Sequence, residues 1–161
     1  MKKLAVILVL FAVFTSCEEE VTHVMQLLIK NDTKSEMTIH LYPKQEEIYG
    51  TMYKDDLWHY RDTVIQLSSG SDITIYTTNE QIKPNELAAQ VFDSIDIVSS
   101  NQNVTTLKFS PDTVIGYSEN LFESNSYWTY ETSRENLQVM FRSNPTQYHD
   151  YTFRISEKKY E

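Results

Sequence analysis

Apolar and polar residues alternate along much of the chain, which is the pattern of strands that bury one face of a sheet. Met37, Ile39 and Leu41 fall on one face, and the residues between them are polar. The segment 151–155 alternates in the same way. Weaker versions of the pattern occur at 25–29, 63–67, 73–77, 95–98, 107–109 and 137–141. The alternation therefore predicts about eight strands.

Polar segments separate several of these strands. The segments 31–35 and 68–72 are rich in Asn, Asp, Ser and Gly, which favour turns. Short turns between consecutive strands indicate antiparallel pairing. The chain lacks internal repeats and Pro-rich linkers, so we expect a single domain over 21–161.

One short helix interrupts the strand pattern. Pro84 suits a first helical turn, and Glu86 suits its positive end. Leu87 and Val91 would line one side of the helix before Asp93. Many short strands with one short helix predict an all-β fold, and we expect an antiparallel β-sandwich.

The early strand pattern resembles that of immunoglobulin-like sandwiches. The resemblance rests on the segments 27–31, 37–41, 65–70 and 73–75. It implies an immunoglobulin-like or related sandwich. Local periodicity does not reveal strand order, so other sandwich topologies stay open.

The first residues have the layout of a secretory signal. Two lysines follow Met1, an uninterrupted apolar run covers 4–14, and a small polar pair precedes Cys17. At about 1.5 Å per residue the apolar run would span roughly 17 Å as a helix, well short of the roughly 30 Å hydrocarbon core of a bilayer. We therefore predict a signal peptide over 1–16.

Cys17 is the sole cysteine, so an internal disulfide is excluded. The segment 14–17 resembles the lipobox of bacterial lipoproteins, with Phe14 where leucine is usual. This resemblance implies that the Cys17 thiol receives a diacylglyceryl group and its amine a fatty acyl chain such as palmitate. The alternative is an ordinary signal peptide followed by a coincidental cysteine.

Three glutamates at 18–20 follow the expected anchor. They resemble the acidic export signal of surface lipoproteins in Bacteroidetes-type bacteria, which implies a position on the outer membrane that faces the cell exterior. A solvated tether over 17–20 is the simpler alternative. The outer membrane is then a partner through the lipid anchor alone.

A second resemblance covers the later part of the chain. The segments 93–97, 109–111, 120–122 and 151–155, together with Trp128, are similar to small surface lipoproteins of Bacteroidetes-type bacteria. The resemblance implies a location and a sandwich fold. It supplies no catalytic residue for this chain.

Composition excludes several function classes. A formal net charge of -9 and a pI near 4.9 disfavour binding to nucleic acid. The three glycines, Gly50, Gly70 and Gly116, are far apart, which excludes the clustered glycines of dinucleotide and phosphate-binding loops. A Gly-x-Ser-x-Gly motif is also absent. We therefore expect no cofactor and a protein that is not an enzyme.

The histidines do not predict a metal site. The chain has four: His23, His40, His59 and His149. No pair has the spacing of a helical zinc site. We assign His23 to the tether and expect His40 to face solvent from a strand. His149 with Asp150, or the acidic and histidine residues within 55–59, could converge, but neither group supplies enough ligands.

The segment 45–61 lacks clean periodicity and is rich in aromatic residues, as binding loops often are. Its candidate contacts are Tyr49, Tyr53, Asp56, Trp58 and Tyr60. Aromatic faces stack on the apolar faces of sugars, and a carboxylate accepts hydrogen bonds from hydroxyl groups. The same composition suits a protein partner. Alternatively, Trp58 fills one end of the core.

A second aromatic cluster follows at Phe122, Tyr127, Trp128 and Tyr130. Trp128 and Tyr130 stand at alternate positions, so they would share one strand face. We expect Trp128 in the core, because sandwiches commonly bury one tryptophan between their sheets.

Three Asp-Ser/Thr-apolar triplets resemble the O-glycosylation acceptor of Bacteroidetes-type secreted proteins. The acceptor residues would be Thr63, Ser94 and Thr113. The alternative is that each triplet is a turn that leads into β-forming residues.

Together these observations predict a lipid-anchored cell-surface module that binds a glycan or protein ligand. One alternative is a structural or assembly component of an outer-membrane complex, which would show an open sheet edge or a large apolar patch. A second is an extracellular glycan hydrolase, which would need two convergent carboxylates in a cleft.

Overall fold

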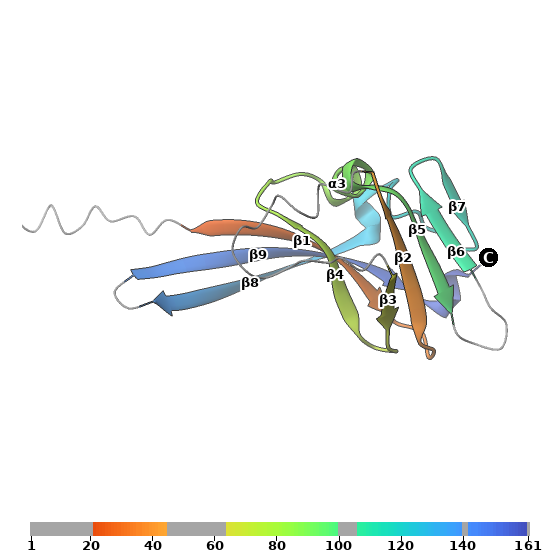
Figure 1. Cartoon of the computed structure of the whole chain (residues 1–161), viewed down its shortest axis with the longest axis horizontal. Coiled ribbons are helices and arrows are strands. Elements are labelled where there is room, and N and C mark those ends of the chain that lie inside the picture. The colour runs from red at the N-terminus through yellow and green to blue at the C-terminus, as the bar shows by residue number, and fades with distance from the viewer. Residues whose placement is uncertain (1–20, 45–63, 100–105, 140–141, 161) are drawn as a thin grey trace, which may run out of the picture.

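A computed structural model describes residues 21–44, 64–99, 106–139 and 142–160, which form an all-β sandwich of two sheets (Figure 1). One sheet has the strand order β4-β1-β9-β8 and the other β3-β2-β5-β6-β7. The strands are β1 (Thr22–Asn31), β2 (Met37–Pro43), β3 (Val64–Leu67), β4 (Asp72–Thr78), β5 (Phe92–Ser99), β6 (Thr106–Ser110), β7 (Thr113–Ile115), β8 (Trp128–Val139) and β9 (Arg142–Ile155). The predicted fold class is confirmed.

The core lies between the two sheets and follows the alternation of the sequence. Met37 and Ile39 of β2 are fully buried, and so are Phe109 of β6 and Phe153 of β9. The rings of Phe109 and Phe153 meet across the sandwich, with centroids 5.7 Å apart. Tyr117 packs edge-on against both rings, at 5.7 and 6.0 Å.

The predicted helix is α3 (Pro84–Val91), and Pro84 stands in its first turn. Leu87, Ala88 and Val91 are buried in the core. The helix ends without a loop, because Phe92 already begins β5. Strand structure therefore starts earlier than the sequence predicted, and Asp93 belongs to β5.

The predicted turns at 31–35 and 68–72 lie against each other. The Asn31 side chain, which is fully buried, donates to the carbonyls of Ser35 and Leu67 at 2.8 and 3.1 Å. The Gly70 N–H donates to the Asn31 carbonyl at 2.7 Å. Polar residues that mark turns in the sequence thus join the two sheets at one end.

The prediction of an antiparallel sandwich needs one correction. The pairs β1·β4, β2·β3, β2·β5, β5·β6, β6·β7 and β8·β9 are antiparallel. The pair β1·β9 is parallel, from Thr22 opposite Thr146 to Asn31 opposite Ile155. Short turns constrain only consecutive strands, whereas β1 and β9 are the first and last strands described.

The hairpin of β8 and β9 extends well beyond the body of the sandwich, and the start of β1 runs beside it (Figure 1). The sequence predicted only 137–141 and 151–155 within this hairpin. On β8, the side chains from Thr129 to Arg134 are all exposed, so no apolar alternation marks the strand. His23 lies in β1 rather than in the tether, contrary to the prediction.

Candidate functional site

The five candidate contacts of the aromatic loop, Tyr49, Tyr53, Asp56, Trp58 and Tyr60, lie outside the described residues. Cys17, the acidic run 18–20 and Thr63 also lie outside them. The hypotheses about these residues therefore stay predictions.

The two remaining candidate O-glycosylation residues lie on the five-stranded sheet. Ser94 is half-buried in β5 opposite Tyr42 of β2. Thr113 begins β7, is exposed, and pairs with Ser110 of β6. Both residues therefore occupy strands, and Thr113 directly follows the tight connection between β6 and β7.

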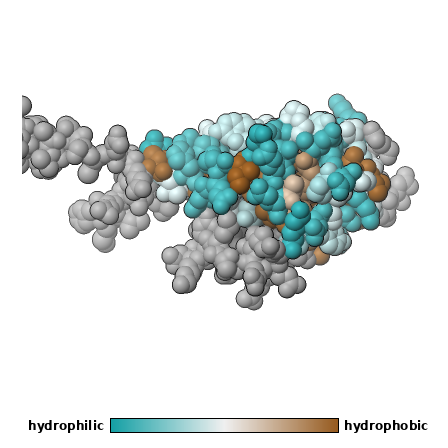
Figure 2. Space-filling model, turned by 90° about the horizontal axis from the view of Figure 1, so that it is seen from above, coloured by the Kyte–Doolittle hydropathy of each residue, from teal (hydrophilic) through white to brown (hydrophobic). Residues whose placement is uncertain are grey.

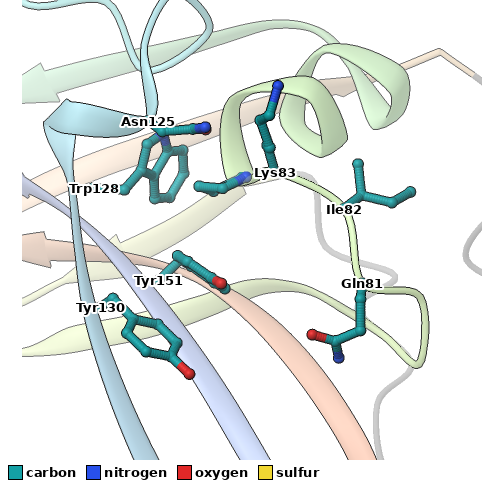
Figure 3. A pocket seen from close by; sticks show the side chains of 8 residues that line it. Gln81, Ile82, Lys83, Asn125, Trp128, Tyr130 and Tyr151 are labelled. Atoms are coloured by element: carbon teal, nitrogen blue, oxygen red, sulfur yellow. The ribbon is translucent and has the colours of Figure 1, made fainter.

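The structure reveals a different aromatic site, an open groove of about 370 Å³ where the hairpin leaves the body (Figure 3). Its lining residues are Gln81, Ile82, Lys83, Pro84, Asn125, Trp128, Tyr130 and Tyr151. We call it the aromatic groove. Trp128, Tyr130 and Tyr151 line one side, and the segment 81–84 faces them across the opening.

Strand register builds the aromatic side of the groove. Trp128 lies opposite Phe153, and Tyr130 lies opposite Tyr151, in the β8·β9 pair. The centroids of the Tyr130 and Tyr151 rings are 4.9 Å apart, with an angle of 33° between the planes. Because side chains two residues apart share a strand face, all three aromatic residues face the same side of the sheet.

Trp128 and Tyr130 have different roles in this arrangement. Trp128 is 7% exposed, and its indole N–H donates to the Leu121 carbonyl at 3.0 Å. The prediction that Trp128 belongs to the core is confirmed, so Trp128 forms the floor of the groove. Tyr130 is 51% exposed and offers its ring to a ligand. The predicted shared face of Trp128 and Tyr130 is also confirmed.

Lys83, Asn125 and Gln81 bring polar groups to the groove. The Lys83 ammonium group forms an ion pair with Glu86 at 2.7 Å. A hydrogen bond and the nearby charge of Glu86 raise the pKa of Lys83. Asn125 begins a short 3₁₀ helix, η1 (Asn125–Tyr127), and Gln81 is exposed before α3. The amides can donate and accept hydrogen bonds, and the ammonium group can donate.

The Tyr151 hydroxyl in the groove stays protonated at neutral pH. Burial, followed by the neighbouring Tyr130, raises the pKa of Tyr151 above its ordinary value of 10.0. The hydroxyls of Tyr151 and Tyr130 can each donate and accept hydrogen bonds. The residues that line the groove include neither a carboxylate nor a cysteine. The groove is suited to stacking and hydrogen bonding.

Two histidines continue the same sheet face beyond Tyr130. The hydroxyl of Tyr130 lies 2.8 Å from Nδ1 of His149. Nε2 of His149 lies 3.0 Å from Nδ1 of His23, across the β1·β9 pair. Within the described residues, no group of three or more His, Cys, Asp or Glu side chains is placed to hold a metal ion.

Asp150 lies next to His149 in β9 but faces the opposite side of the sheet. It pairs with Glu131 of β8. Burial, followed by the charge of Glu131, raises the pKa of Asp150. Its Oδ1 is buried and makes no hydrogen bond within the described part of the chain. These two carboxylates lie outside the aromatic groove.

Sequence analysis identified Trp128 and Tyr130 but missed Tyr151, His149 and the segment 81–84 as parts of this site. The signal for Tyr151 was present, because the alternation at 151–155 was recognised. What the sequence lacked was the register that places Tyr151 opposite Tyr130. The segment 81–84 contributes through the position of α3, which local sequence does not encode.

Comparison with known proteins supplies no relative for this chain. No protein-family model matches it, and no curated protein or solved structure matches it. None of the described helices has the length and apolar character needed to cross a bilayer.

Proposed function

We propose that this protein is a lipid-anchored binding module that faces the cell exterior at the outer membrane and holds a glycan in the aromatic groove. The observation that carries the proposal is the exposed Tyr130 ring beside Tyr151, over the buried Trp128. Sugars have apolar faces that stack on aromatic rings and hydroxyls that bond to amide groups. Gln81 and Asn125 provide such amides at the groove.

The proposed anchor is the acylated Cys17, on the resemblance of 14–17 to a lipobox. Several acyl chains, at about 0.8 kcal/mol for each buried CH₂ group, would hold the protein firmly at a bilayer. The excess of Asp and Glu over Lys and Arg would repel anionic head groups, so the lipid would supply the attachment. Metabolic labelling with an alkyne fatty acid should mark the wild-type chain and not the Cys17→Ala variant.

Binding can be tested with matched tyrosine variants. We expect Tyr130→Ala to weaken glycan binding by about tenfold or more, because hot-spot aromatic contacts are worth at least about 1.4 kcal/mol. Tyr42→Ala is the control, since Tyr42 is similarly exposed (47%) but lies on the other sheet. The measurement is a glycan array followed by calorimetry on the full chain in detergent. Equal binding by wild type and Tyr130→Ala would rule out the groove.

A protein ligand in the groove is the second candidate for the same site. Tyrosine and tryptophan are enriched at protein interfaces as well as at sugar sites. On the face seen in Figure 2, apolar residues form small separate spots among hydrophilic ones. The described residues on that face therefore form no large apolar docking patch. A ligand that resists glycosidase treatment but is lost after protease treatment would favour this candidate.

The assembly alternative has one observation in its favour, the edge strand β8. Its outer edge has no neighbour among the described strands, and the side chains from Thr129 to Arg134 are exposed. Such an edge can accept a strand from another protein. A photo-crosslinking residue at Thr132 in native membranes should then capture one outer-membrane protein. The same residue at exposed Thr113 should not capture it.

A further inference from the structure

A continuous row of rings leads out of the aromatic groove along the projecting hairpin. The ring centroids of Tyr151 and Tyr130 are 4.9 Å apart, and those of Tyr130 and His149 are 6.1 Å apart with only 11° between the planes. The ring centroids of His149 and His23 are 5.3 Å apart. We call Tyr151, Tyr130, His149 and His23 the ring strip.

The ring strip lies on one face of one sheet. Tyr130 is opposite Tyr151 in the β8·β9 pair, and Met25 is opposite His149 in the β1·β9 pair. His23 is two residues before Met25, so it points to the same face. Tyr130 and His23 are exposed, and His149 and Tyr151 are half-buried. The strip is therefore open to a ligand along its length.

Hydrogen bonds connect the polar atoms of the strip into one chain. If the Tyr130 hydroxyl donates to Nδ1 of His149, then Nε2 of His149 donates to Nδ1 of His23, and Nε2 of His23 carries an outward N–H group. If the chain runs the other way, Tyr130 offers the outward O–H group and His23 offers an acceptor nitrogen. One end donates while the other accepts in both arrangements.

A chain with one donor end and one acceptor end favours a particular ligand chemistry. A hydroxyl group both donates and accepts, so it satisfies either end of the chain in either direction. Lys83 is the one cationic residue among those that line the groove. The Lys83 ammonium group at the groove is already paired with Glu86. Neutral, hydroxyl-rich ligands therefore match the strip better than anions do.

We propose that the ring strip is a second subsite continuous with the aromatic groove, and that the ligand is a linear neutral oligosaccharide. This inference rests on the proposed function. A single pyranose is about the size of one aromatic ring, so each sugar unit would cover about one ring of the strip. A chain that starts in the groove reaches His149 and His23 with its later sugar units. Affinity then rises with chain length, and the histidines matter only for longer chains.

The test compares neutral oligosaccharides, from the monosaccharide to the hexasaccharide, on the full chain in detergent. The probes are gluco-, manno-, xylo- and N-acetylglucosamine oligomers, measured by calorimetry. We expect the hexasaccharide of the preferred sugar to bind about tenfold more tightly than the disaccharide. In the His23→Leu variant, the hexasaccharide should bind no more tightly than the disaccharide. The affinity of this variant for the disaccharide should stay within about twofold of the wild-type value.

Two further variants separate ligand contact from a structural effect. His23→Gln should keep most of the gain with chain length, because an amide both donates and accepts hydrogen bonds. His40→Leu, on a strand of the other sheet, should bind every oligomer like the wild type. Melting temperatures of all variants are compared, since His23 is exposed and its replacement should leave the fold intact.

Three outcomes would overturn the inference while the proposed function stands. The first is an affinity that does not depend on chain length. The second is a His23→Leu variant that binds the disaccharide and the hexasaccharide less tightly than the wild type by the same factor. The third is a His23→Leu variant that binds both as tightly as the wild type. If no oligosaccharide binds the wild type, both the inference and the glycan ligand of the proposed function fail.

Discussion

Tyr117 connects the two sheets through both its ring and its hydroxyl. The ring is buried against Phe109 and Phe153, and the hydroxyl donates to the Arg154 carbonyl at 2.9 Å. The same hydroxyl accepts a hydrogen bond from the Ser156 N–H at 3.0 Å. Burial raises the pKa of Tyr117 to about 12, so the hydroxyl stays protonated and can donate.

We expect Tyr117→Phe to lower the free energy of unfolding by about 1–3 kcal/mol, because it leaves a backbone N–H and a carbonyl without their partner. Tyr160→Phe is the matched control. The Tyr160 ring packs on Tyr117, but its buried hydroxyl makes no hydrogen bond in the described structure. Its removal should cost less than about 1 kcal/mol or be neutral. Urea unfolding followed by fluorescence measures both. Equal losses would contradict this assignment.

Asp150 opposes folding at neutral pH, since its pKa is higher in the folded chain than the ordinary value of 3.8. Below that value the carboxyl group is protonated in both states and has no effect. As pH rises, the unfolded chain releases the proton first, so stability falls until the folded group also ionises. Asp150→Asn should therefore stabilise the protein at neutral pH and lose this advantage in acid.

Thermal melts at several pH values between about 3 and 7 test this prediction. Asp112→Asn is the control, because Asp112 is exposed, and its melting temperature should stay close to that of the wild type. A stabilisation by Asp150→Asn that is as large in acid as at neutral pH would show that charge is not the cause.

At the scale of elements, two glycines adopt the left-handed backbone region that other residues disfavour. Gly70 has a φ of 77°, and Gly116 has a φ of 76°. A methyl group on Gly116 would lie 3.3 Å from both the Thr106 carbonyl oxygen and a Leu107 methyl carbon, whereas Gly70 has open space. Another residue at either position would therefore meet the same backbone strain, but only at position 116 would it also be crowded.

We expect Gly70→Ala to destabilise the protein by about 1 kcal/mol, and Gly116→Ala to destabilise it further. The reason for the difference is that β6 must move to accept the added methyl group. Differential scanning calorimetry of the two variants provides the comparison. If Gly70→Ala costs as much as Gly116→Ala, backbone conformation alone would explain both effects.

How far the sequence predicted the elements depends on whether one face of each strand is buried. The alternation of Met37, Ile39 and Leu41 located β2, because all three side chains reach the core. The strand β7 has three residues, too few for a period to be recognised. The first part of β8 was missed because its side chains from Thr129 to Arg134 are exposed on both faces. The parallel pairing of β1 and β9 depends on contacts between distant residues, which local pattern does not encode.

The candidate site was predictable only in part, because local sequence pattern does not encode contacts between distant strands. Trp128 and Tyr130 were recognised as neighbours on one face, because that relation is local. The ring contacts of Tyr130 with Tyr151 and His149 join β8 to β9, and the contact of His149 with His23 joins β9 to β1. Such a site forms only after the sheet has assembled.

At the scale of the whole molecule, β9 lies between β1 and β8, so we expect the sheet to require the residues of β9. A chain that ends at Val139 lacks β9, so β1 loses a neighbour and β8 loses its only described one. We expect this truncated chain to lack a cooperative thermal transition by circular dichroism. A chain that ends at Ser156 keeps β9 and should still unfold cooperatively. A cooperative transition in the shorter chain would show that β9 is dispensable.

The pairing of the first described strand with the last also sets an order of events during synthesis. His23 and His149, which touch in the finished sheet, are 126 positions apart. A chain that leaves the ribosome or a secretion pore N-terminus first exposes β1 long before its partner emerges. Sheet closure has to wait for the end of the chain, and contacts of such long range slow folding. The β4-β1-β9-β8 sheet therefore cannot be completed until the last described strand has been synthesised.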